Sequence, residues 1–213
     1  MKLQSLHQFL WNRLHTETIH ADLIQIVFDL ALAAKLIGYN ISRNKLFQVA
    51  SDHCQSNFEG QQPHPLNVLA HDIFRSYLEK SGKVTCHLSS EIAATAERVH
   101  KNLHSSYTAF IDPLDYTDSM DALESPGSIF SVYPNLENRG AVKTGRIQKL
   151  AGYFLYGSTI TLVLTIGEGV HVFTYDPHIG EFLLTHKNLK ISKEATTYCV
   201  QLEIQEKYLK TLQ

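Results

Sequence analysis

The stretch TLVLTIGEGVHVFTYDPHIGEFLL (161–184) has the clearest structural pattern in the chain. Runs rich in β-branched and aromatic residues alternate with GEG (167–169) and DPHIG (176–180), which are typical turn sequences. The spacing predicts three consecutive antiparallel strands joined by short turns.

Similar short runs precede or overlap this stretch and enlarge the predicted sheet. They are KVTCHLS (83–89), SYTAFID (106–112), GSIFSVY (127–133), AGYFLYG (151–157) and STITLVLTIGEG (158–169). Glycine, proline or aspartate separates most of them, which favours short strands over helices.

Helical periodicity dominates the first part of the chain. LHQFLWNRL (6–14) predicts an amphipathic helix, with Leu6, Phe9, Leu10 and Leu14 near one face. LIQIVFDLALAAKLIG (23–38) is apolar nearly all round, so it predicts a buried helix. We expect Asp22 to cap or open this helix and Gly38-Tyr39-Asn40 to end it.

A third helix is predicted in PLNVLAHDIFRSYLEKSG (65–82). Pro65 suits a first helical turn and Gly82 suits the residue past the end. Its predicted inward stripe consists of Leu66, Leu69, Ile73 and Tyr77. Helices first and strands after predict an α+β fold, in which helices pack on a mostly antiparallel β-sheet. The length of 213 residues allows one domain with a substantial core or two small ones.

Composition excludes several classes of protein. The 213 residues carry a net charge of -2, so no cationic field favours nucleic acid or an anionic membrane surface. No apolar run is long enough to span a bilayer, and the N-terminus has no secretory signal pattern. Three scattered cysteines do not suggest a disulfide framework, so we expect a cytoplasmic protein.

The stretch FIDPLDYTDS (110–119) contains the candidate chemistry. Asp112 ends a predicted buried strand, and we expect Asp115 to return to the same space after a tight turn. Two carboxylates and the carbonyl of Leu114 are oxygen ligands of the kind that Mg²⁺ prefers. The backbone after them could hold a phosphate, although Tyr116 stands where glycine is usual.

These motifs together resemble class I fructose-1,6-bisphosphatase. The similarity is carried by DPLD (112–115), GSIFSVY (127–133) and AGYFLYGSTITLVLTIGEGVHVFTYDPHIGEFLL (151–184). It is weaker in HPLNVLAHDIFRSYLEKSG (64–82), HLSSEIA (87–93) and LHQFL (6–10). The resemblance implies the sugar-phosphatase fold, with a mostly antiparallel mixed β-sheet in a single N-terminal domain, 1–213. It also implies magnesium-dependent hydrolysis of a sugar phosphate, a phosphoric monoester.

The resemblance also implies particular site residues. Glu91, Asp112, the carbonyl of Leu114 and Asp115 match metal ligands of the family. Tyr116 and Thr117 fall where backbone amides hold the sugar phosphate.

Other family positions are changed in this chain. Asn67 and Ile92 stand where the family has carboxylates that help to activate water, and Gln61 replaces a further carboxylate. An isoleucine cannot accept a proton, and an asparagine cannot act as a carboxylate base. These changes predict a degenerate active site, as in a pseudoenzyme.

The allosteric AMP site of the family is also predicted to be lost. Ile24 falls where the family has a threonine, and the family's Lys-Tyr pair reads Ser106-Tyr107 here.

The length of the chain is a further departure. The resemblance ends near Tyr198, whereas full family members continue into a C-terminal substrate-binding domain. One hypothesis is therefore a non-catalytic interaction or regulatory subunit, which forms a homo-oligomer or associates with a full-length phosphatase. The alternative is a magnesium-dependent sugar-phosphate phosphatase completed by a second chain. A third is that the sequence is a fragment of a longer protein.

Overall fold

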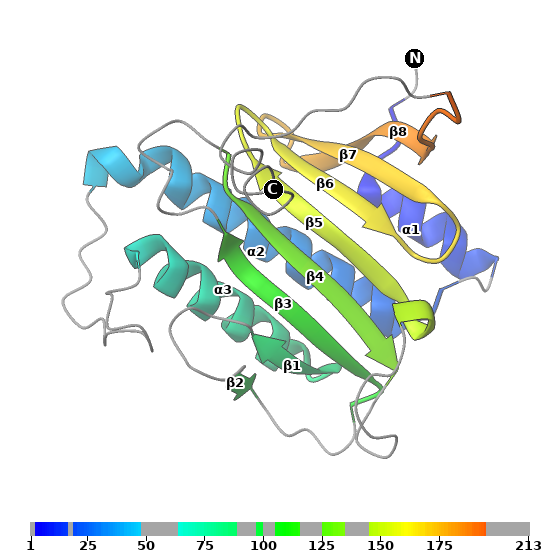
Figure 1. The fold of residues 1–213 in the computed structure, drawn as a ribbon, viewed down its shortest axis with the longest axis horizontal. Coiled ribbons are helices and arrows are strands. Elements are labelled where there is room, and N and C mark those ends of the chain that lie inside the picture. The colour runs from blue at the N-terminus through cyan, green and yellow to red at the C-terminus, as the bar shows by residue number, and fades with distance from the viewer. Residues whose placement is uncertain are drawn as a thin grey trace, which may run out of the picture.

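The computed structural model describes residues 3–16, 19–47, 64–88, 97–99, 105–115, 125–134 and 145–194. Within these residues, three α-helices lie on one face of an eight-stranded sheet (Figure 1). The predicted α+β architecture is confirmed.

The sheet is mixed but mostly antiparallel. Its strands are β1 (Val84–Leu88), β2 (Glu97–Val99), β3 (Tyr107–Asp115), β4 (Gly127–Pro134), β5 (Leu150–Tyr156), β6 (Ile160–Thr165), β7 (Val170–Asp176) and β8 (Glu181–Leu189). They lie in the order β2-β1-β3-β4-β5-β6-β7-β8, and the β1–β3 pair is the parallel one. The short edge strand β2 has no counterpart in the sequence-based prediction, because three residues are too few to show a period.

The predicted meander in 161–184 is confirmed. Strand β7 pairs antiparallel with both β6 and β8. In the β7–β8 turn, the Asp176 carboxylate accepts a hydrogen bond from the N–H of His178 at 2.9 Å. Gly180 has a φ of 72°, a conformation that glycine adopts without steric cost. The turn residues therefore act as the sequence predicts.

Helix α1 (Leu6–His15) packs near β8 at one edge of the sheet (Figure 1). A capping box starts it: the Ser5 hydroxyl accepts from the N–H of Gln8, and the Gln8 side chain accepts from the N–H of Ser5. The predicted apolar face is confirmed, since Leu6, Phe9 and Leu10 are buried.

Helix α2 (Ala21–Phe47) is longer than the sequence predicts, and its expected end at Gly38-Tyr39-Asn40 is wrong. Gly38 continues the helix and lies against β6. A Cβ atom at Gly38 would approach Cδ1 of Ile160 to 2.5 Å. This glycine therefore allows close contact between helix and sheet rather than ending the helix.

Helix α3 (Pro65–Ser81) begins and ends as predicted. Pro65 occupies the first turn, and Gly82 has a left-handed φ of 62° at the C-terminal cap. The predicted stripe is displaced by about one position: Leu69, Ile73 and Tyr77 are only partly buried. The buried apolar side chains are Leu66, Ala70, Phe74 and Leu78. The displacement arises because α3 packs on α2 as well as on β1 and β3.

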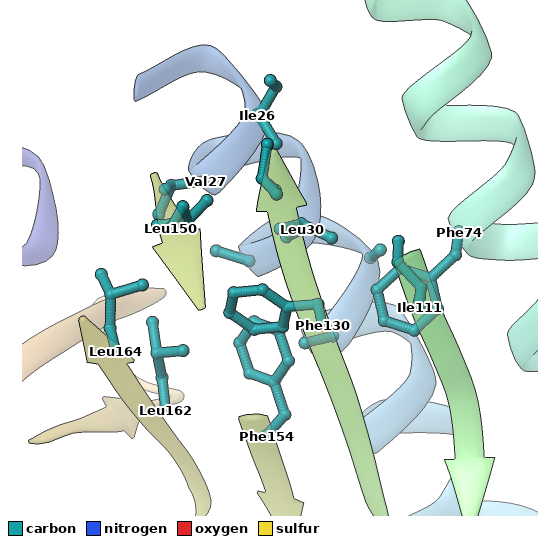
Figure 2. Packing of buried hydrophobic residues seen from close by; sticks show 14 of the residues in the cluster. Ile26, Val27, Leu30, Phe74, Ile111, Phe130, Leu150, Phe154, Leu162 and Leu164 are labelled. Atoms are coloured by element: carbon teal, nitrogen blue, oxygen red, sulfur yellow. The ribbon is translucent and has the colours of Figure 1, made fainter. Parts of the chain in front are cut away.

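The core lies between the helices and one face of the sheet (Figure 2). Phe130 of β4 and Phe154 of β5 meet with ring centroids 5.4 Å apart, and Leu30 of α2 lies close to them (Figure 2). We call the opposite sheet face the outer face. Its large apolar side chains include Ile129, Tyr153 and Leu155, which are exposed. No helix in the described ranges is both long enough and apolar enough to cross a bilayer.

Candidate functional site

The DPLD segment lies in a bulge of β3, and the tight turn predicted after Asp112 is wrong. The strand runs on to Asp115, and its register against β4 shifts between Asp112 and Asp115. Asp112 pairs with Ile129 and Asp115 pairs with Gly127, so Pro113 and Leu114 together oppose one residue. Proline inside a sheet is expected at such a bulge, because it has no N–H to donate to the ladder.

The bulge decides on which face the two carboxylates lie. Residues paired across antiparallel strands share a face, and residues two apart on one strand also share a face. Asp112 and Asp115 therefore both lie on the outer face, since their partners Ile129 and Gly127 are two residues apart. A regular strand would place residues three apart on opposite faces. The burial pattern agrees, because Pro113 and Leu114 are buried between a half-buried Asp112 and an exposed Asp115.

Asp112 borders a groove of about 680 Å³ on the outer face. Among the described residues that line this groove, Asp112 carries the one charged side chain. The groove's apolar lining includes Phe110, Ile129, Tyr153, Val163 and Leu189. The structure therefore places a carboxylate at the margin of a hollow apolar surface.

The chemistry of this donor set fits a hard divalent cation. Asp112 and Asp115 supply carboxylate oxygens on one face, and the main-chain carbonyl of Leu114 lies between them in sequence. Oxygen ligands of this kind suit Mg²⁺, which keeps several of its waters. Across the described part of the chain, no three His, Cys, Asp or Glu side chains converge. Predicted site residues outside the described ranges are Gln61, Glu91, Ile92, Tyr116 and Thr117.

Asn67 lies in the first turn of α3, with its side chain buried at 7% exposure. Its N–H donates to the carbonyl of His64 at 2.8 Å, and the His64 ring nitrogen Nδ1 accepts from the N–H of Leu66 at 3.2 Å. Two main-chain N–H groups of the first turn therefore have hydrogen-bond acceptors. An amide carries no carboxylate charge, so this position supplies no carboxylate base.

Two buried hydroxyl groups next to the bulge were not identified from the sequence. Ser128 Oγ donates to the carbonyl oxygen of Pro113 at 2.6 Å, and it lies 2.7 Å from the hydroxyl of Tyr156. Burial raises the pKa of Tyr156, so the phenol stays protonated. The sequence offered one signal for them: Ser128 is a small polar residue at a core-facing position of GSIFSVY.

Two of the three residues expected at the lost AMP site, Ser106 and Tyr107, line a second pocket, whereas Ile24 is not part of its lining. Ser106 and Tyr107 line a pocket of about 430 Å³ with His20, Ala21 and Asp22 at the start of α2. The Asp22 carboxylate lies 2.9 Å from Nζ of Lys83. Burial raises the pKa of Tyr107, and the charge of Asp22 adds to this effect. Ile24 is buried, and its side chain has no hydroxyl group. Nothing in the described residues tests AMP binding, so its loss stays a prediction.

Known proteins match most of this chain. The family description "Fructose-1-6-bisphosphatase, N-terminal domain" matches residues 4–187. A curated relative, "Fructose-1,6-bisphosphatase class 1" of Cytophaga hutchinsonii, is 36% identical over 207 residues. That alignment covers 93% of this chain and 60% of the relative.

Solved structures show the same relationship. The holo form of Leishmania major fructose-1,6-bisphosphatase matches with a TM-score of 0.75 and 30% identity. The match covers 92% of this chain and 62% of the Leishmania major chain. The T-state form of the same enzyme matches with a TM-score of 0.69 and 29% identity, over 92% and 61% of the two chains. The chain therefore belongs to the fructose-1,6-bisphosphatase family and resembles its N-terminal domain.

Proposed function

We propose that this chain is a catalytically impaired member of its family that acts as an interaction subunit. The observation that carries the proposal is the outer face of the sheet. Ile129 is 58% exposed, Leu155 is 42% exposed and Tyr153 is 39% exposed, and all three lie on adjacent strands. Contiguous exposed apolar side chains commonly mark an association surface.

The occupant we favour is a second copy of the chain. The groove lining is almost uncharged, so the same face of another molecule would complement it without an opposing charged partner. Two sheets can pack face to face about 10 Å apart. A two-fold arrangement would place the same patch on both partners.

Catalytic impairment is inferred from the altered proton-accepting positions. Asn67 is a buried amide where the resemblance implies a carboxylate, and Ile92 is aliphatic where it implies another. General base catalysis typically contributes about 10²–10⁴-fold to a rate. Loss of these groups would leave little unaided turnover.

The test is light scattering after size-exclusion chromatography, with the wild type, Tyr153→Lys and Ile179→Lys. Ile179 is a matched control, because it is 60% exposed but lies in the β7–β8 turn, away from the groove. We expect a wild-type oligomer that Tyr153→Lys dissociates and Ile179→Lys preserves. A second arm adds the purified Cytophaga hutchinsonii relative. If the wild type is monomeric but binds the relative, a family phosphatase is the partner rather than a second copy. If the wild type is monomeric and does not bind the relative, the proposal is contradicted.

A second candidate function is sugar-phosphate hydrolysis completed by another chain. It is favoured by the two carboxylates that share the outer face beside the groove. Asp112, the Leu114 carbonyl and Asp115 would hold the divalent cation, which when bound polarises a phosphoryl group and lowers the pKa of a water molecule. The chain spans 60% of the Cytophaga hutchinsonii relative, so the remaining part of that relative can be supplied separately.

The discriminating assay measures phosphate release from fructose 1,6-bisphosphate with Mg²⁺, with and without that added polypeptide. Turnover that requires both polypeptides and disappears in Asp115→Asn would support the second candidate. Absence of turnover from a mixture in which the two polypeptides demonstrably bind each other would contradict it.

A further inference from the structure

We propose that Ser128 and Tyr156 are positioning residues for divalent-cation binding. Their hydrogen bonds hold the β3 bulge, and the bulge keeps Asp112 and Asp115 on one face of the sheet. This inference concerns binding of the cation rather than assembly, so it does not depend on whether the chain associates with a second copy.

Ser128 occupies the position that can control the bulge. It is the one residue of β4 that opposes both Pro113 and Leu114. The extra residue of a bulge has no partner in the strand ladder. The Ser128 hydroxyl, at 2% exposure, supplies a bond to this segment through the Pro113 carbonyl.

The donor order in this group follows from proton counting. A serine hydroxyl has one proton, and Ser128 gives it to Pro113. The phenol of Tyr156 must therefore donate to Ser128 Oγ across their 2.7 Å contact. The bonds run in one direction, from Tyr156 to Ser128 to the Pro113 carbonyl.

Tyr156 is itself anchored on two sides. Its N–H donates to the carbonyl of Pro126 at 2.9 Å, just before β4. Its ring lies against α2, since a Cβ atom built at Gly38 would lie 3.4 Å from Cδ1 of Tyr156. The phenol thus links the helix layer to the bulge, and its position is set by the core.

At the β3 bulge, the helix side of the sheet holds the main chain in place, and the outer face presents the cation ligands. The hydroxyl groups are buried on the helix side, and the carboxylates lie on the outer face. If the bulge relaxed to a regular ladder, a shift of one residue would turn one carboxylate to the opposite face. The cation would then lose one of its two described carboxylate ligands.

The experiment is a calorimetric titration of the full chain with Mn²⁺. We expect the wild type to bind, and Ser128→Ala to weaken binding about 10-fold or more, the usual effect of removing a partner that orients a metal ligand. Tyr156→Phe should weaken it less, because Ser128 keeps its bond to Pro113. Ser128→Thr should restore binding, because it keeps the hydroxyl and suits a strand.

A matched control separates this positioning role from general stability. Ser105 and Thr85 form another buried hydroxyl pair, 2.7 Å apart, near the opposite end of β3. Ser105→Ala should lower the melting temperature and leave Mn²⁺ affinity unchanged.

Three results would overturn the proposal. They are a wild type that does not bind Mn²⁺, a Ser128→Ala variant of unchanged affinity, and equal losses of affinity in Ser128→Ala and Ser105→Ala. If Ser128→Ala does not fold, Tyr156→Phe and Ser128→Thr decide the matter: loss in the first and retention in the second support the proposal, and any other combination contradicts it.

Discussion

At the scale of single residues, His171 is a fully buried base that the fold holds neutral. Its ring packs edge-on against Phe9 of α1 at 4.6 Å between centroids, and its Nδ1 accepts from the N–H of Asn188 at 3.4 Å. Burial lowers the pKa of His171, and the charges of Arg13 and Lys187 lower it further. The carbonyl and carboxylate of Glu168 oppose this shift only in part.

The lowered pKa of His171 predicts acid-sensitive stability. In the unfolded chain this histidine takes up a proton below about pH 6.5, whereas the folded protein resists protonation until a lower pH. The contribution of His171 to the free energy of unfolding should therefore fall as the pH drops below about 6.5, and this contribution should level off below the folded pKa of His171. Urea unfolding at pH 7.5 and at several acidic values measures this slope.

The variant His171→Gln should reduce that slope, because glutamine does not titrate. His178→Gln is the control, since His178 is exposed in the β7–β8 turn. Parallel pH profiles for the wild type and His171→Gln would show that His171 is not the group responsible.

At the scale of secondary-structure elements, Gly152 allows β5 to fit between its neighbours. A Cβ atom there would clash with the carbonyl oxygen of Val163 and would lie 2.7 Å from Cζ of Phe130. The Val163 carbonyl belongs to the main chain of β6, so it cannot rotate away. Glycine in a strand often marks such a close approach of two backbones.

We therefore expect Gly152→Ala to lower the free energy of unfolding by about 3 kcal/mol, the upper part of the usual range for an overfilled core. Chemical denaturation measures the change. Gly145→Ala is the matched control, because nothing lies within 4 Å of the added methyl group. It should stay within about 0.5 kcal/mol of the wild type. Equal stability of the two variants would contradict this prediction, because it would mean that β5 and β6 move apart at little cost to admit the methyl group.

At the scale of the whole molecule, the exposed outer face connects assembly with stability. A face buried between two copies stabilises the folded state by mass action, so apparent stability rises with protein concentration. At about 100 times the dissociation constant the gain is roughly 2.7 kcal/mol. Thermal unfolding over a hundredfold range of concentration should therefore show a rising melting temperature.

Tyr153→Lys should remove this concentration dependence and leave the melting temperature of the dilute protein nearly unchanged, because Tyr153 is already partly exposed. A wild-type melting temperature independent of concentration would contradict self-association through this face.

Much of the fold was predictable because its signals are local. The strands of 161–184 follow from alternating side chains and turn residues, and α3 is bounded by Pro65 and Gly82. The end of α2 was mispredicted because Gly38 has the same local preference whether it ends a helix or contacts Ile160. The residues of the candidate site were predictable, because DPLD contains side chains with oxygen ligands. The sequence does not show that Asp112 and Asp115 lie on the same face of the sheet.

By itself, the sequence determined the α+β class, the order of helices and strands, and the identity of Asp112 and Asp115 as candidate ligands. Periodicity, turn chemistry and side-chain type are properties of neighbouring residues. Only the tertiary structure decided the length of α2, the bulge in β3 and the bonds from Ser128 and Tyr156 to Pro113. These features depend on which distant segments pair and pack, and the register of β4 against β3 is what brings the two carboxylates onto one face.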